Sequence, residues 1–192
     1  MNAIDQSPIK FITTRHEQGA AFMADVYGRL TGKAGVCLAT LGPGATNLVT
    51  GVADADGDGA PLVAITGQVG TERMHITGHQ FLDLTKMFEP ITKRTKMVVR
   101  PDTVGLAFKY AESEKPGATH IDMPVNVAKM PVPEGEKPLH KKTAPKEYAE
   151  LDTVQDAAGM IFQAKNPVIL AGSSVVRGHA SKELTEFATK LK

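Results

Sequence analysis

Glu17 is the side chain whose sequence context best suits proton exchange with a ligand. It follows the short apolar run of residues 11–14, which we predict to be a buried strand. From Glu17 to residue 31 apolar residues recur at helical spacing, and Gly32 is placed to end that helix. Ligands of parallel sheets bind at the carboxyl ends of strands, and a helix start favours an anion. The pattern equally fits a solvated carboxylate that only stabilises the helix.

A glycine-rich turn, Gly42-Pro43-Gly44, follows a second predicted strand at 36–40 and precedes a predicted helix at 45–55. Glycine lets the backbone approach a ligand closely, and the helix start offers free N–H donors. Asn47 stands where a dinucleotide-binding fingerprint has its third glycine, and the lysine of a phosphate loop is absent. The turn therefore predicts either a binding loop of another kind or a tight turn without a ligand.

Two segments imitate metal sites without completing them. The acidic turn 54–59 begins like a calcium loop, but Ile65 stands where such a loop needs a bidentate glutamate. His75 and His79 have a spacing that could hold zinc, yet the glutamate base of the zinc-protease pattern is missing. We predict no metal site, and we predict that Cys37, in an apolar run, is a buried core thiol.

Short apolar runs alternate with helical patterns along residues 1–130, although residues 71–93 show no clear period. Further strands are predicted at 62–66, 97–99 and 119–123, and a helix opened by Pro101 carries the apolar residues of 104–111. This alternation predicts an α/β fold with a mainly parallel sheet flanked by helices.

The later part of the chain changes in character. Residues 131–150, in which proline is interspersed with charged residues, predict an interdomain linker. Residues 151–192 predict a helix at 154–164, a strand at 167–172, a loop and a helix at 179–191. We interpret them as the incomplete beginning of a second, central α/β domain.

The composition excludes some classes of partner. The chain has 192 residues, of which 42% are hydrophobic and 22% charged, and its net charge is +1. No basic cluster interleaved with aromatic residues suggests nucleic-acid binding. No apolar run approaches the ~20 residues that span a bilayer, and no signal-peptide pattern is visible. We expect a cytoplasmic protein that binds neither nucleic acid nor membranes.

The most specific part of the sequence is a series of ordered blocks, namely Thr14–Asp25, Tyr27–Arg29, Gly32-Lys33, Gly35–Asn47, Pro61–Gln68, Phe88–Lys93 and Lys115–Pro124. Together these blocks resemble the pyrimidine-binding domain of the thiamine-diphosphate-dependent acetolactate synthase family. The likeness covers about residues 8–130, and the segment from 166 onward resembles the start of the family's central domain.

The resemblance implies a role for Glu17. In this family the corresponding glutamate hydrogen-bonds N1′ of the cofactor's aminopyrimidine ring. That contact favours the tautomer whose nitrogen removes the C2 proton of the thiazolium. The resemblance also implies that Thr40, Gly42 and Gly44 line the pyrimidine pocket and that Asn47 fixes this loop.

Two further residues are implied with less closely matched surroundings. Gln80 corresponds to a glutamine near the thiazolium and the substrate, and Phe88 to a wall of the substrate pocket. The activity implied is decarboxylation of a 2-oxo acid such as pyruvate and its condensation with a second 2-oxo acid.

The family's site forms between the pyrimidine domain of one subunit and the diphosphate domain of its partner, which implies a homodimer or homotetramer. The signature that binds Mg²⁺ and diphosphate, Gly-Asp-Gly followed by Asn, is absent here. Gly57-Asp58-Gly59 spells its first half, but it lies in the pyrimidine domain, and the next asparagine is Asn126. Some members also bind FAD, and the sequence leaves that question open.

Other departures bear on the assignment. The family's glycine-and-proline block on the first strand is absent, so we expect the domain to lack its first strand and helix. Leu41 stands where many relatives carry serine. Glyoxylate carboligase, sulfoacetaldehyde acetyltransferase and 2-oxo-acid decarboxylase share these blocks and stay open as alternatives. A non-catalytic truncated relic stays open as well.

The missing diphosphate signature leads to a first prediction. The 192-residue chain alone should be inactive and should bind thiamine diphosphate weakly or not at all, because it cannot anchor Mg²⁺ and the diphosphate. Calorimetric titration with thiamine diphosphate and Mg²⁺ checks this, and micromolar affinity would contradict it.

Overall fold

The structure is a computed structural model that describes residues 2–74, 76, 78–100, 103–132 and 148–191. The chain divides into two compact units, Met1–Ala144 and Pro145–Lys192. Most of the predicted linker, residues 133–147, and Pro101 lie outside the described residues. Within the described part, none of the helices combines the length and apolar character that crossing a membrane requires.

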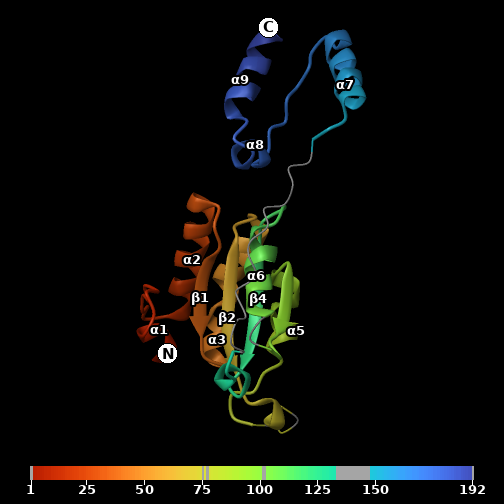
Figure 1. The fold of residues 1–192 in the computed structure, drawn as a ribbon. Helices are drawn as coiled ribbons and strands as arrows, with labels where there is room; N and C mark the ends of the chain where they lie inside the picture. Colours follow the sequence, from red (N-terminus) through yellow and green to blue (C-terminus); the bar gives the residue numbers. More distant parts are fainter. Residues whose placement is uncertain (1, 75, 77, 101–102, 133–147, 192) are drawn as a thin grey trace. The chain divides into compact units, whose positions relative to one another are not determined.

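The first unit is built on a four-stranded parallel sheet with the order β1-β2-β4-β3 (Figure 1). In the register of the central pair, Leu62 of β2 lies opposite Ala118 of β4, and Gln68 lies opposite Pro124. The strands are β1 (Gly35–Ala39), β2 (Leu62–Gln68), β3 (Arg94–Met97) and β4 (Ala118–Pro124). Because β2 and β4 are central, they are buried along nearly their whole length, and the polar residues among their apolar ones are buried with them.

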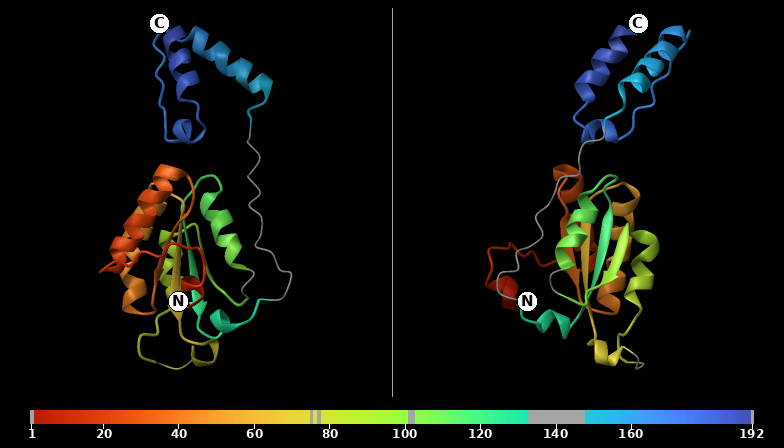
Figure 2. Two further views of the ribbon diagram at one scale, coloured as in Figure 1. Left: turned by 60° about the vertical axis from the view of Figure 1, so that its left-hand side comes forward. Right: turned by 45° about the vertical axis from the view of Figure 1, so that its right-hand side comes forward.

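Helices cover both faces of this sheet, as the two views in Figure 2 show. One apolar cluster joins α2, α3, α4 and α5 to the sheet, and a second joins α6 to the opposite face. The helices of this unit are α1 (Asn2–Asp5), α2 (Glu17–Thr31), α3 (Pro43–Asn47), α4 (Val49–Gly57), α5 (Leu84–Phe88) and α6 (Val104–Glu112), with short 3₁₀ turns η1 (Thr71–Arg73), η2 (Glu89–Ile91) and η4 (Val127–Lys129).

The second unit, by itself, contains α7 (Leu151–Gln163), α8 (Ser174–Arg177) and α9 (Ser181–Lys190). The strand predicted at 167–172 is wrong, because these residues form no strand and Val168 and Leu170 are more than nine-tenths exposed. A strand needs a neighbour for its backbone groups, and none of the described residues pairs with this segment.

The α/β fold class is confirmed, and several elements match closely. The helix starting at Glu17 ends at Thr31, where Gly32 adopts φ 67° as a left-handed cap. The helix predicted at 45–55 is divided at Leu48 into α3 and α4. The strand predicted at 97–99 lies earlier in the chain, at Arg94–Met97, so its core residue Val98 follows it.

The buried strand predicted at 11–14 is also wrong. Residues 9–14 have no regular structure, and the side chains of Phe11 and Ile12 are largely exposed. Thr14 Oγ1 donates to the carbonyl oxygen of His16 at 2.9 Å, which turns the chain into α2. A short apolar run alone does not distinguish a buried strand from an extended surface segment.

The acidic turn that imitates a calcium loop is part of an ion-pair cluster. Arg29 of α2 binds Asp25 and Asp54, each at 2.8 Å, and also Asp58. Its guanidinium thus joins α2 to the end of α4.

Cys37 is 2% exposed, and burial raises the pKa of its thiol to about 12, as expected of a core thiol.

The close packing of α2 on the sheet depends on Gly28. A Cβ atom added there would lie 2.3 Å from the carbonyl oxygen of Pro61, just before β2. A substitution must therefore push the helix away from the sheet, and overpacking of this kind costs about 1–3 kcal/mol.

We predict that Gly28→Ala lowers the free energy of unfolding by about 1–3 kcal/mol, although alanine normally favours a helix. Gly57→Ala in α4 is the matched control, because a Cβ atom there meets nothing within 4 Å. Urea denaturation checks both variants. Equal stability of the two variants would contradict the packing argument.

Candidate functional site

Glu17 is the first residue of α2, and its carboxylate is half-buried. His16 caps the helix, since its Nδ1 accepts the N–H of Gln18 at 3.1 Å. Capping by the preceding residue leaves the Glu17 side chain available for contacts outside its own helix. Glu17 Oε2 accepts a hydrogen bond of 3.0 Å from Nδ2 of Asn47, the last residue of α3.

This hydrogen bond sets the charge of the carboxylate. The pKa of Glu17 lies below its usual range, mainly because Asn47 donates to the charged form. A backbone hydrogen bond and nearby His16 lower the pKa further, while burial opposes them. Glu17 is therefore an ionised acceptor at neutral pH, which is the state required to receive a proton or a hydrogen bond.

The glycine turn packs directly against this carboxylate. A Cβ atom added at Gly44 would lie 2.8 Å from Thr40 Cγ2 and 3.3 Å from Glu17 Oε1. Gly42 adopts φ 64°, a conformation that other residues rarely accept. Thr40 directly follows β1, so the strand end, the turn and the carboxylate form one site at the carboxyl edge of the sheet.

Gln80 reaches the same turn from a distant part of the sequence. A Cβ atom added at Gly42 would lie 2.7 Å from Gln80 Cβ and 2.9 Å from the Gln80 carbonyl oxygen. The loop after β2 and the turn containing η4 meet at this end of the sheet (Figure 1), where the Thr71 N–H donates to Asn126 Oδ1 at 3.0 Å. Six of the predicted residues thus lie together and form what we call the Glu17 cluster: Glu17, Thr40, Gly42, Gly44, Asn47 and Gln80.

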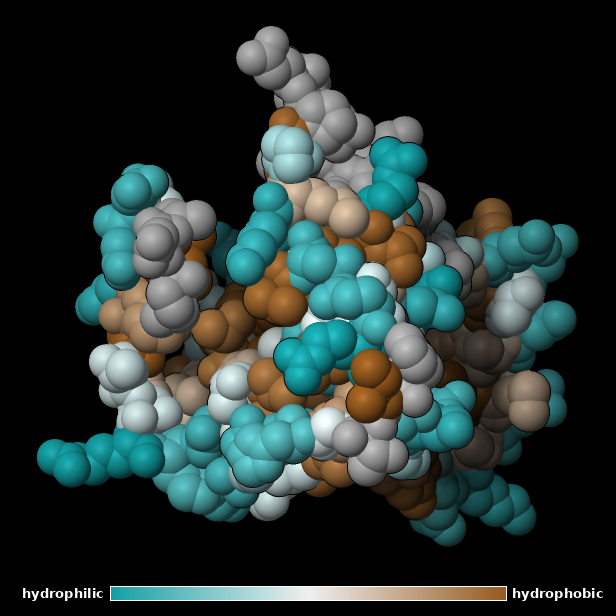
Figure 3. Space-filling model, turned by 90° about the horizontal axis from the view of Figure 1, so that it is seen from below, coloured by the Kyte–Doolittle hydropathy of each residue, from teal (hydrophilic) through white to brown (hydrophobic). Residues whose placement is uncertain are grey.

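Figure 3 looks at the molecule from below in Figure 1, and apolar patches there lie among polar side chains. This face is neither uniformly hydrophilic nor uniformly hydrophobic. A mixed surface suits a ligand with an aromatic ring and a few polar atoms.

Phe88 does not join the cluster. Its side chain is fully buried, and its ring is stacked with that of His120 at 4.0 Å between centroids. Phe88 is expected to line a substrate pocket, but in the structure it lies in the core. The reason is that α5 turns its last residue toward the sheet. Of the histidine pair considered for zinc, His75 lies outside the described residues.

The sequence analysis missed a buried polar network beneath the site. Gln68 Nε2 donates to Asp122 Oδ2 at 3.2 Å and to the Leu82 carbonyl oxygen at 3.0 Å. Thr66 and His120 continue the network across β2 and β4. Polar residues inside the central apolar strands were the available signal, since each needs a buried partner.

Burial shifts both ionisable members of this network. It raises the pKa of Asp122 to about 6, although hydrogen bonds from Gln68 and Thr66 oppose the shift. It lowers the pKa of His120 to about 3, so the imidazole is neutral at physiological pH. The network is therefore a set of matched hydrogen bonds and not an ion pair.

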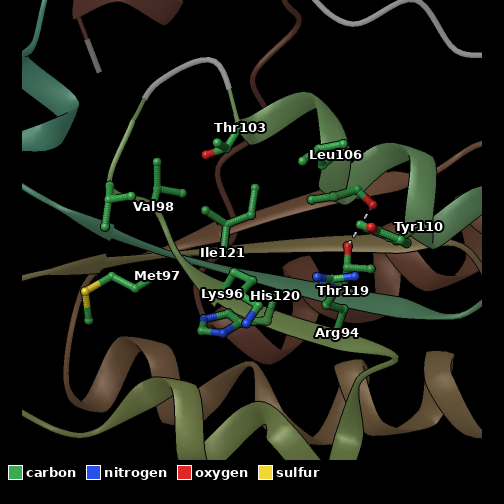
Figure 4. A pocket seen from close by; sticks show the side chains of 12 residues that line it. Arg94, Lys96, Met97, Val98, Thr103, Leu106, Tyr110, Thr119, His120 and Ile121 are labelled. Atoms are coloured by element: carbon green, nitrogen blue, oxygen red, sulfur yellow. Dashed lines mark hydrogen bonds between the residues drawn. The ribbon is translucent and has the colours of Figure 1, made fainter.

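A separate cavity of about 270 Å³ lies between β3 and α6 (Figure 4). Apolar side chains such as Val98, Leu106 and Ile121 line it, and Arg94 lies over the Tyr110 ring at 4.4 Å. None of its lining residues belongs to the Glu17 cluster. Its lining also includes the polar side chains of Lys96 and Thr103.

Comparison with known proteins identifies the family. Residues 1–94, which hold the whole Glu17 cluster, match the family described as "Thiamine pyrophosphate enzyme, N-terminal TPP binding domain". These residues thus carry the N-terminal domain of the thiamine pyrophosphate enzyme family. The matched part includes β1, β2 and the glycine turn between them.

Several proteins similar to this chain are named acetolactate synthases. A probable acetolactate synthase large subunit of Methanocaldococcus jannaschii is 39% identical over 203 residues, covering 100% of this chain and 34% of that protein. The acetolactate synthase isozyme 1 large subunit of Escherichia coli is 40% identical, covering 97% and 34%. The acetolactate synthase of Mycobacterium avium is 38% identical, covering 96% and 30%. The chain spans about a third of the length of these relatives.

The residues around Glu17 fit the pyrimidine half of thiamine pyrophosphate. Gly44 leaves open the space beside Glu17 Oε1 that a Cβ atom would enter, and the carboxylate is an ionised acceptor. Among the described residues, no group of three or more His, Cys, Asp or Glu could hold a metal ion. The Glu17 carboxylate therefore fits a ring nitrogen that donates a hydrogen bond.

The Asn47 contact yields a prediction about the Glu17 charge. Asn47→Ala should raise the pKa of Glu17, because the largest cause that lowers this pKa is removed. A carboxyl whose pKa is lowered on folding stabilises the fold at pH values above its unfolded pKa, and the part of this stabilisation that comes from Asn47 should be lost in the variant. NMR titration of the Glu17 carboxyl checks the shift. Asn126→Ala, whose side chain binds Thr71 instead, should leave the Glu17 pKa unchanged.

Proposed function

We propose that this chain supplies the pyrimidine-binding half of the active site of a carboligase of the acetolactate synthase type. The substrates are 2-oxo acids: one, such as pyruvate, loses carbon dioxide, and the remaining two-carbon unit is joined to a second 2-oxo acid. The names of the relatives support the reaction, and the Glu17 cluster supports the role of this chain in it.

The observation that carries the proposal is the placement of the Glu17 carboxylate. It lies at the start of α2, is held by Asn47 at 3.0 Å and faces the space left by Gly44. A carboxylate in that position accepts the hydrogen of a protonated ring nitrogen. An amide would not exchange the proton, because it is not a base at neutral pH.

The chain's own residues then have distinct tasks. Thiamine diphosphate, when bound, supplies the acidic carbon that adds to the keto group of the substrate. Glu17 holds or releases the proton at the pyrimidine nitrogen, and Asn47 keeps the carboxylate oriented. Glu17 would lose contact with water when a bound ring covers the space beside Gly44, and this desolvation would raise the Glu17 pKa toward the range where a proton is shared.

In this proposal Mg²⁺ and the diphosphate are held by a domain of a second subunit, in a homodimer or homotetramer. The uncovered apolar face of α2 supports such an association. Side chains such as Phe22, Val26 and Leu30 on this helix are 36%, 49% and 81% exposed. A helix that carries the reacting carboxylate on its first turn and an uncovered apolar face beyond it suits a subunit interface.

The test is acetolactate formation from pyruvate by the complete polypeptide that carries this sequence, with thiamine diphosphate and Mg²⁺. Glu17→Gln should lower kcat by about 10²–10⁴-fold, the usual effect of losing a proton-transfer partner. Glu89→Gln, an exposed glutamate of η2, is the matched control and should act as wild type. Near-normal turnover of the Glu17→Gln variant would remove Glu17 from the mechanism.

A further inference from the structure

The loop between η1 and α5 places Gln80 against the glycine turn. Gln80 itself adopts φ 63°, in the left-handed region. A residue with a side chain rarely adopts this conformation, which persists only when its surroundings hold it. The contact between the Gln80 backbone and Gly42 is close, so a small displacement of the loop would separate them.

The loop is anchored just after Gln80. Asp83 caps α5 by accepting the N–H of Lys86 at 3.1 Å, and the N–H of Phe81 donates to the Gly78 carbonyl oxygen at 3.3 Å. Both contacts are local to the loop or its helix. Contacts of Leu82 join the loop to the sheet: Leu82 packs against the apolar cluster, and Gln68 Nε2 donates to the Leu82 carbonyl oxygen at 3.0 Å.

The orientation of the Gln68 amide is determined by its partners. Its Oε1 accepts the N–H of Val69 at 3.0 Å, so its Nε2 must face the two acceptors, Leu82 and Asp122. All three partners of the amide are thus of the correct kind, and flipping it would set donor against donor. Gln68 is 3% exposed, so water cannot replace any of these contacts freely.

Asp122 is held in turn by the neighbouring strand. Thr66 Oγ1 donates its hydrogen to Asp122 Oδ1 at 3.4 Å. The same hydroxyl oxygen of Thr66 then accepts from His120 Nε2 at 2.8 Å. His120 Nδ1 then accepts the hydroxyl of Thr95, at 2.7 Å. The chain of donors runs in one direction across β3, β4 and β2 and ends at the Asp122 carboxylate.

We propose that Gln68, supported by Asp122, is a positioning residue that fastens the loop of residues 78–83 to the sheet and so presents Gln80 at the Gly42 turn. The idea that Gln80 acts near the reacting groups rests on the proposed function. The fastening itself rests on the contacts of Gln68. Gln68 acts through Gln80 and does not itself touch the Glu17 cluster.

The test compares Gln68→Leu, which keeps the size of the side chain and removes both donors, with Thr119→Val. Thr119 is the matched control because its buried hydroxyl also donates to backbone carbonyl oxygens, those of Leu62 and Ala107, away from the 78–83 loop. In the 192-residue chain, Gln68→Leu should raise amide hydrogen exchange of Phe81 about tenfold, and Thr119→Val should not. The Glu17 pKa should stay unchanged in both variants.

Substitutions at Asp122 separate a hydrogen-bond role from a packing role. Asp122→Asn keeps an oxygen that accepts from Gln68 and should preserve the slow exchange of the loop, whereas Asp122→Leu should lose it. Equal exchange in the Gln68→Leu and Thr119→Val chains would overturn the proposal. If Gln68→Leu does not fold, hydrogen exchange is measured in the wild-type chain instead. Both side-chain amide protons of Gln68 should then exchange slowly, and rapid exchange would overturn the proposal.

Activity of the complete polypeptide distinguishes this proposal from the proposed function. Gln68→Leu should lower kcat while the affinity for thiamine diphosphate stays within about twofold, since the Glu17–Asn47 contact is untouched. A normal kcat together with a loosened loop would overturn the link to Gln80. Wild-type enzyme without carboligase activity would instead contradict the proposed function and leave the fastening, read from hydrogen exchange, standing.

Discussion

The hydrogen bond between Asn47 and Glu17 is the contact on which the rest of the site depends. It joins the first residue of α2 to the last residue of α3, two elements separated by β1 in the sequence. It orients the carboxylate, lowers its pKa and brings the glycine turn alongside it. Without this contact the same carboxylate would be a solvated helix-start residue, which is the other interpretation that its position allows.

Absent side chains matter as much as present ones in this site. Gly44 and Gly42 lie where a Cβ atom would strike Glu17, Thr40 or Gln80, so both contacts exist only with glycine. The carboxylate then has two opposed influences: Asn47 favours its charged form, and any ligand that covers it would favour the neutral one. In the proposed function, a group balanced in this way exchanges a proton with the bound ring and returns to its charged state in water.

The two faces of the parallel sheet are packed differently. Its α6 face is packed with apolar residues and contains the cavity beside Arg94, while its other face contains the polar network of Gln68 and Asp122. That network lies under the Gln80 loop, where a purely apolar core would leave the Leu82 carbonyl oxygen without a side-chain partner. Hydrogen bonding in the core thus determines the position of a surface loop.

The sequence alone determined the parts that depend on neighbouring residues: the helix from Glu17 to Gly32, the glycine turn, and the ordered blocks that mark the family. Local spacing controls such features through capping and the φ freedom of glycine. Only the tertiary structure decided that residues 11–14 and 167–172 form no strands, because pairing requires a neighbour distant in the chain. It also decided that Phe88 is buried and that Gln68 reaches Leu82, since burial and long-range hydrogen bonds depend on which segments meet.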